Sequence, residues 1–122
     1  MDTTSAKAAT ELLVRHWKEG RTLEALPPAL RPTTRAQAYA AQAHLEVHSQ
    51  QPLFGWKIAA TSVAGQKHIN VDGPIAGRLL AEMVFHDGET LPFGANRMRV
   101  AEAEFAFCMG RDLPPRATPY AM

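Results

Sequence analysis

The spacing of the apolar residues changes once along this chain, at Pro52, from a helical period to an alternating one. Before Pro52, two stretches repeat apolar residues every three or four positions and predict helices over residues 5–19 and 34–50. Gly20 stands where the first helix would end, and Thr34, followed three residues later by a glutamine, forms a capping box for the second. The first part of the chain is therefore predicted to be helical.

The part after Pro52 is predicted to consist mostly of strands. Residues 54–60 alternate large and small side chains, and a short helix is expected over residues 62–69, before an Asp72-Gly73-Pro74 turn. Further strand candidates follow the turn, at residues 75–80, 83–86, 89–91 and 97–110. Helices followed by strands, rather than a regular alternation of the two, predict an α+β fold with a helical region over 1–52 and a β-rich region over 53–122.

Composition excludes several classes of partner. The chain has 122 residues, of which 46% are hydrophobic and 20% are charged, and a formal net charge of +1. The basic residues are scattered, so neither nucleic acid nor an acidic membrane surface is expected as a partner. No apolar run approaches the ~20 residues of a membrane helix. The single cysteine, Cys108, cannot form an internal disulfide and is expected to be a small buried filler, which agrees with a cytoplasmic protein.

Glu102-Ala103-Glu104 places two acids in the last predicted strand. Alternate residues of a strand point to the same face, so both carboxylates would share a face with Val100, Ala106 and Cys108. Like charges on a small apolar face repel each other and lose solvation. We expect a positive partner there, and Mg2+ or Mn2+ is the simplest candidate because both prefer carboxylate oxygens. Two ordinary surface acids on a solvated edge strand are the alternative.

Lys57 is the second candidate site residue. It would share its strand face with only Gly55 and Ala59, which leaves space around the ammonium group. Such a lysine could bind a substrate carboxylate or assist proton transfer, and an ordinary surface lysine is the alternative.

The remaining motifs give weaker indications of a functional site. His44 and His48 are four residues apart on the second predicted helix, but Glu46 is displaced from the position that a zinc protease motif requires. A solvated helix face explains them better than a metal site. Neither the spacing of a phosphate loop nor that of the dinucleotide fingerprint occurs among the glycines.

Taken together, five segments resemble the 2-keto-4-pentenoate hydratase family of the fumarylacetoacetate hydrolase superfamily, in the family's order and approximate spacing. They are AYAAQ at 38–42, GWKIAATS at 55–62, VDGPIAG at 71–77, AEAEFAF at 101–107 and GRDLP at 110–114.

The resemblance implies roles for three residues. Glu102 and Glu104 would be two of three acidic ligands of Mg2+ or Mn2+, and Lys57 would be the active-site lysine. In the family, the metal chelates the 2-oxo and carboxylate oxygens of a short dienoate so that water can add to it. The function implied is a metal-dependent hydratase, a lyase of aromatic catabolism that acts on a small 2-oxo acid.

The resemblance also implies a fold. Residues 1–52 would form an N-terminal helical cap, and residues 53–122 the first part of a β-rich catalytic domain, the first strands of a mixed β-roll that this chain leaves incomplete. A third acidic ligand would lie beyond Met122, so little turnover is expected from the chain alone. Ile75 stands where many members carry an acid, which weakens the assignment of substrate.

Two other functions stay open. One is a metal-dependent decarboxylase of 2-oxo-3-enedioates, and the other is a non-catalytic, truncated paralogue or subunit. We expect a homo-oligomer, or association with a longer homologous subunit.

Overall fold

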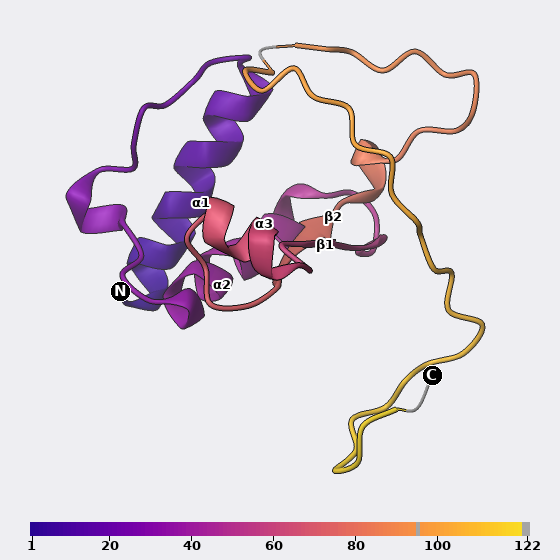
Figure 1. Ribbon diagram of the computed structural model, residues 1–122. Helices are drawn as coiled ribbons and strands as arrows, with labels where there is room; N and C mark the ends of the chain where they lie inside the picture. Colours follow the sequence, from indigo (N-terminus) through magenta and orange to yellow (C-terminus); the bar gives the residue numbers. More distant parts are fainter. Residues whose placement is uncertain (95, 121–122) are drawn as a thin grey trace.

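The computed structural model describes residues 1–94 and 96–120, and its first element is the helix α1 (Thr3–Lys18) (Figure 1). Asp2 caps its start by accepting a hydrogen bond from the backbone N–H of Ser5 at 2.7 Å. Its end is a Schellman turn, in which Gly20 has φ +63° and the N–H of Arg21 donates to the carbonyl of His16 at 2.8 Å. The predicted first helix and its glycine stop are thus confirmed.

The second helical stretch changes type midway. It starts as α2 (Arg35–Ala43), where the Thr34 hydroxyl accepts from the N–H of Gln37 at 3.2 Å, as the capping box predicts. It continues as the 3₁₀ helix η2 (His44–His48) rather than as α-helix to residue 50. A shorter 3₁₀ turn, η1 (Pro28–Leu30), interrupts the proline-rich connector before it.

Small side chains hold α1 and α2 close together. Ala6 and Ala9 of α1 pack against Ala41 of α2, and all three are buried. The buried hydroxyl of Thr10 crosses the same interface and donates to the carbonyl of Ala41 at 2.5 Å. Met1 and two connector leucines, Leu26 and Leu30, close the edge of this cluster. The best-packed core therefore lies between the helices and not on the sheet.

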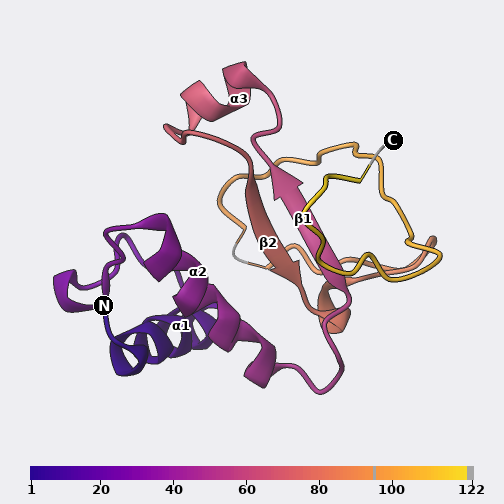
Figure 2. The same cartoon turned by 90° about the horizontal axis from the view of Figure 1, so that it is seen from below.

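The sheet consists of two antiparallel strands, β1 (Gly55–Ala59) and β2 (Ile75–Leu79), in the register Lys57↔Gly77. The helix α3 (Val63–His68) joins them and is capped by the Ser62 hydroxyl. Figure 2 shows α2 on the β2 side of the sheet, whereas the yellow, last part of the chain lies on the β1 side. Helices with a separate antiparallel sheet confirm the predicted α+β class.

Three predicted strands are wrong. Residues 83–86 and 89–91 form no strand, and the 3₁₀ turn η3 (Ala81–Met83) precedes them. Residues 97–110 are exposed and, after a bend at 97–98 and a positive φ of 51° at Arg99, form an extended segment that is paired with no strand among residues 1–94 and 96–120. A strand exists only when a neighbour satisfies its backbone groups, and an alternating sequence does not supply that neighbour. Cys108 lies in this segment and is exposed, so its predicted burial is also wrong.

No helix in the described part of the chain has the length and apolar character needed to cross a membrane.

Candidate functional site

The three residues singled out from the sequence meet in the structure. The ammonium nitrogen of Lys57 lies 3.0 Å from a carboxylate oxygen of Glu102 and donates a hydrogen bond to the carboxylate of Glu104. Lys57 projects from the middle of β1, whereas the glutamates lie on the extended segment 45 or more residues later. Both carboxylates therefore converge on one positive charge, although their segment is not a strand.

Electrostatics at this site favour the charged form of the lysine. The Glu104 carboxylate, followed by that of Glu102, accepts from the ammonium group and raises the pKa of Lys57 above its ordinary value. The side chains of Glu102 and Glu104 are 61% and 46% exposed. Exposed ion pairs are screened by water and contribute little to folding, so another cation could replace the ammonium group at small cost.

Carboxylate oxygens are the donors that Mg2+ and Mn2+ prefer, so Glu102 and Glu104 fit a site for such an ion as part of its ligand set. Among residues 1–94 and 96–120, no three His, Cys, Asp or Glu residues are grouped so that they could hold a metal ion. The pair would therefore need further ligands from water, substrate or another polypeptide.

A cavity of about 760 Å³ adjoins Lys57 and Glu104. Its walls come from two parts of the chain, β1 with its flanking residues and the extended segment. The residues that line it are Phe54, Gly55, Trp56, Lys57, Ile58, Thr61, Leu79, Glu104, Phe105, Ala106 and Phe107. A mostly apolar wall beside a charged cluster suits a small organic anion.

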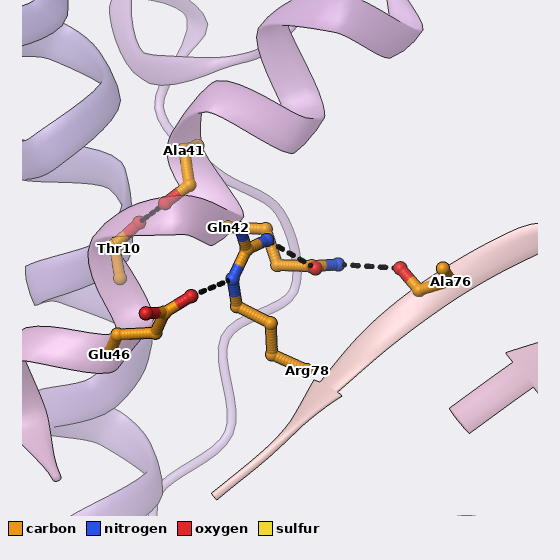
Figure 3. A network of polar contacts seen from close by, with 6 residues as sticks. All are labelled: Thr10, Ala41, Gln42, Glu46, Ala76 and Arg78. Atoms are coloured by element: carbon orange, nitrogen blue, oxygen red, sulfur yellow. Dashed lines mark hydrogen bonds and ion pairs between the residues drawn. The ribbon is translucent and has the colours of Figure 1, made fainter. Parts of the chain in front are cut away.

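Two side chains of α2 hold strand β2 in place by its backbone. The N–H of Ala76 donates to the Tyr39 hydroxyl at 3.0 Å, and the carbonyl of Ala76 accepts from the Gln42 side-chain amide at 3.0 Å. Figure 3 shows the Gln42 contact with its neighbours. Since Ala76 is paired with Ile58 in the sheet register, this clamp also positions β1 and Lys57 relative to the helices.

Arg78 of β2 makes a second connection to the helical part, through α2 and η2 (Figure 3). Its guanidinium group donates to the carboxylate of Glu46 at 2.5 Å and to the side-chain oxygen of Gln42 at 3.0 Å. The Arg78 side chain is only 16% exposed, so these charge-assisted bonds are better shielded from water than those of Lys57.

The other motifs lie away from this chemistry. Asp72, in the predicted turn, forms an ion pair with Arg35 at the start of α2. His44 and His48 fall on a 3₁₀ helix, which has three residues per turn, so residues four apart no longer share a face. The structure thus gives no geometric support for a metal site at these histidines.

This chain is similar in sequence to several hydratases. It is 35% identical over 123 residues to 2-keto-4-pentenoate hydratase 1 of Dechloromonas aromatica, a match that covers 96% of this chain and 46% of that protein. It is 34% identical over 117 residues to the TodF product hydratase of Pseudomonas putida, covering 91% and 42% of the two chains. The chain belongs to the 2-keto-4-pentenoate hydratase family. It spans about half the length of the curated relatives it matches. No family model and no solved structure matches it.

Four of the five hydratase-like segments contact one another in the structure. Segment 38–42 clamps segment 71–77 through Ala76, segment 71–77 pairs with segment 55–62 in the sheet, and Lys57 of 55–62 meets the glutamates of 101–107. The roles of Tyr39, Gln42 and Arg78 were not foreseen. Tyr39 and Gln42 are three residues apart on one helix, a spacing that places them on the same face and could have suggested a joint contact.

Proposed function

We propose that the polypeptide to which this chain contributes hydrates a short 2-hydroxydienoate or 2-oxo-enoate in the breakdown of aromatic compounds. The observation that carries the proposal is the convergence of Lys57, Glu102 and Glu104 beside a cavity. Eight curated relatives match the chain and all are named as hydratases, among them a 2-oxo-hept-4-ene-1,7-dioate hydratase of Escherichia coli that is 35% identical over 83 residues.

The three residues would fill two roles, that of metal ligand and that of substrate-binding residue. Glu102 and Glu104 would hold Mg2+ or Mn2+ through their carboxylate oxygens. When bound, the ion supplies Lewis-acid polarisation of the 2-oxo and carboxylate oxygens of the substrate. Lys57 carries a positive charge at neutral pH and would bind the substrate carboxylate, which orients the double bonds along the cavity. The apolar residues among those that line the cavity would exclude water from part of the substrate.

We also propose that residues 1–52 act as a helical cap and residues 53–122 as the first part of a β-roll. The hydrogen bonds of Tyr39 and Gln42 to the Ala76 backbone support these two roles, because they link the helical part to the strand pair that carries Lys57. A complete site would then also require residues from the half of the hydratases that this chain does not match. The chain alone would show little turnover.

The test is a hydration assay on a polypeptide that joins this chain to the part of 2-keto-4-pentenoate hydratase 1 that it does not match. Loss of dienoate absorbance should stop after chelation and return with Mg2+ or Mn2+. Glu102→Gln and Glu104→Gln should each lower kcat/KM by about 100-fold or more, since several kcal/mol of transition-state stabilisation depend on the ion. Glu24→Gln, an exposed change in the connector, is the matched control and should leave the rate unchanged.

Lys57→Met should raise KM for the substrate by about tenfold or more, because one charge-assisted contact to the carboxylate is lost. Hydration that survives complete metal removal would refute the proposal. Release of CO2 from a 2-oxo-3-enedioate without hydration would assign a decarboxylase instead. Absence of both reactions, with the glutamate variants behaving like the parent, would indicate a non-catalytic subunit.

A further inference from the structure

Ala60, just after the end of strand β1, has a strained backbone. Its φ of +56° lies in the left-handed region, which is unfavourable for a residue with a Cβ. Strain of this kind persists only where surrounding contacts impose it, and it is concentrated at functional sites. Residues on both sides of Ala60, namely Ile58 and Thr61, line the cavity that adjoins Lys57. The strained turn therefore lies at the candidate site.

Contacts from α3 impose this turn. The Ala60 carbonyl accepts from the Gln66 side-chain amide at 3.0 Å, and the Ser62 hydroxyl accepts from the N–H of Gly65 at 3.1 Å. Gly65 packs so closely that a Cβ there would lie 3.3 Å from the Ser62 hydroxyl oxygen and 3.5 Å from the Cα of Ala60. Figure 2 shows α3 just beyond the end of β1. Thr61 is thus held in place by contacts that do not involve its own side chain.

The Thr61 hydroxyl is available to a ligand. Thr61 is exposed and lines the cavity, and within residues 1–94 and 96–120 its hydroxyl forms no hydrogen bond with another residue. Lys57 and Thr61 both carry hydrogen-bond donors on the wall that β1 and its flanking residues form, whereas Glu104 lies on the wall of the extended segment. The wall along β1 therefore offers one charged and one uncharged donor.

The same wall is apolar at its other end. Phe54 precedes β1, and Leu79 is paired with Gly55 at the start of the strand. Lys57 is at the middle of the strand and Thr61 follows its end. A small 2-oxo acid has the same polarity, with a carboxylate at one end and a hydrocarbon tail at the other. The wall matches such an acid when the carboxylate lies near Lys57 and Thr61 and the tail extends toward Phe54.

We propose that Thr61 is a substrate-binding residue, whose hydroxyl donates a hydrogen bond to the same substrate carboxylate that Lys57 binds. This inference rests on the function proposed above. An ammonium group on a flexible stem attracts a carboxylate without fixing its orientation, whereas a second donor on a fixed turn does so. Because the turn is held without the Thr61 hydroxyl, no bond within the chain is lost when substrate binds. Thr61 thus sets the direction of the substrate tail.

The experiment uses the joined polypeptide of the hydration assay, with Mg2+ present. Thr61→Val removes the hydroxyl and keeps the β-branched shape. KM for the dienoate should rise about tenfold, as expected for one lost hydrogen bond to a charged group, while kcat changes by less than about twofold. The inhibition constant of 2-oxopentanoate should rise by the same factor. This compound has the carboxylate and the 2-oxo group but no double bond to hydrate, so it reports binding without chemistry.

Three further variants separate the hydroxyl from the rest of the side chain. Thr61→Ala also lacks the hydroxyl and should show the same rise in both constants. Thr61→Ser keeps the hydroxyl, and its constants should stay within about threefold of the parent values. Thr22→Val makes the same change as Thr61→Val at an exposed position of the connector, so it is the matched control and should behave like the parent.

The outcomes separate this inference from the proposed function. Hydration with unchanged constants in Thr61→Val and Thr61→Ala would overturn the role of Thr61 and leave the proposed function intact. An equal rise in Thr61→Ser would also overturn it, because the hydroxyl would not be responsible. So would a fall in kcat with an unchanged inhibition constant, since the effect would then not be on binding. Absence of hydration in the parent with metal present would overturn both.

Discussion

The guanidinium carbon of Arg78 lies 4.7 Å from the centre of the Trp56 ring. The two residues are cross-strand partners in the register, so this contact joins β1 to β2 while the same guanidinium group bonds to Glu46 on the helical side. Arg78 thus contacts the strand of Lys57 and the helices at once. We consider it a positioning residue for the site.

Replacing Arg78 should loosen the sheet from the helices. Arg78→Met should lower the free energy of unfolding by about 2 kcal/mol, because a cation–π contact and two hydrogen bonds from a shielded charge are lost. Arg78→Lys should retain less than half of the stabilisation that Arg78→Met loses, since an ammonium group cannot make the same forked contacts. Denaturant unfolding followed by Trp fluorescence measures both. Arg97→Met, at an exposed position, should cost less than about 0.5 kcal/mol, and an equal loss there would contradict the interpretation.

Local chemistry made part of this fold predictable. The stop at Gly20, the cap at Thr34 and the alternation in residues 55–59 each act within a few neighbouring residues, and each is confirmed. Strand pairing cannot be predicted in this way, because it depends on segments that are far apart in the sequence. The alternation in 97–110 equals that of a strand, yet Phe105 has no opposite strand and stays exposed among the described residues.

The same distinction applies to the candidate site. The sequence indicated that two close carboxylates require a positive neighbour, but the contact between Lys57 and Glu104 spans 47 residues and depends on where the chain returns. The clamp on Ala76 spans 37 residues to Tyr39 and likewise follows no local pattern. Glu102, Glu104 and Lys57 as metal and substrate residues stay predictions until activity is measured.

Tyr39 should matter for stability through its hydroxyl oxygen alone. Tyr39→Phe leaves the N–H of Ala76 without its acceptor, and a lost hydrogen bond of this kind costs about 1 kcal/mol. The change should also speed exchange of the Ala76 amide, which a purely hydrophobic role for the ring would not do. Tyr120→Phe removes a hydroxyl that bonds to Pro114 in an exposed segment and should change stability by less than about 0.5 kcal/mol. Equal effects of the two changes would argue against the clamp.

Lys57 and a divalent cation should compete for the same carboxylates. In this chain alone, Mn2+ should bind with a roughly millimolar Kd, as expected for a site with few protein ligands. Lys57→Met should tighten that binding roughly fivefold, because a positive charge next to the cation is removed. Titration calorimetry or Mn2+ paramagnetic resonance measures the Kd. Glu102→Gln and Glu104→Gln should abolish binding, and Mn2+ uptake that all three variants leave unchanged would place the ion elsewhere.

The ionisation of Glu82 should make the free energy of unfolding depend on pH in the acidic range. The N–H of Gln50 donates to its carboxylate at 2.8 Å and, with the Ser49 hydroxyl, lowers the pKa of Glu82 below its ordinary value of 4.5. Folding then favours the ionised form, so this contribution is complete above the unfolded pKa and is lost as pH falls through the folded one. Unfolding midpoints from about pH 6 down to about pH 3 should fall more steeply in the parent than in Glu82→Gln.

The control for this pH series is Glu24→Gln, which changes the same charge at an exposed connector position. It should keep the steep acid dependence of the parent. Asp2, whose pKa is lowered by the N–H of Ser5, contributes in the same direction and is present in every variant, so the difference between Glu82→Gln and Glu24→Gln isolates Glu82. Parallel curves for all three proteins would contradict the prediction.

Ala60 turns the chain from β1 toward α3 in a left-handed conformation, with φ +56°. Its carbonyl accepts from the Gln66 side chain at 3.0 Å, which helps to hold that turn. A residue with a Cβ pays about 1 kcal/mol for left-handed geometry, whereas glycine adopts it freely.

Ala60→Gly should therefore be neutral or stabilising by about 0.5 kcal/mol, because relief of strain offsets the extra entropy of glycine in the unfolded chain. Ala59→Gly, one residue earlier and inside β1, gains no such relief and should cost about 0.5–1 kcal/mol. Urea unfolding of the two variants measures the difference directly. If both glycines destabilise equally, Ala60 does not hold the left-handed turn in solution, and the direction in which β1 leaves the Lys57 site would have to be reconsidered.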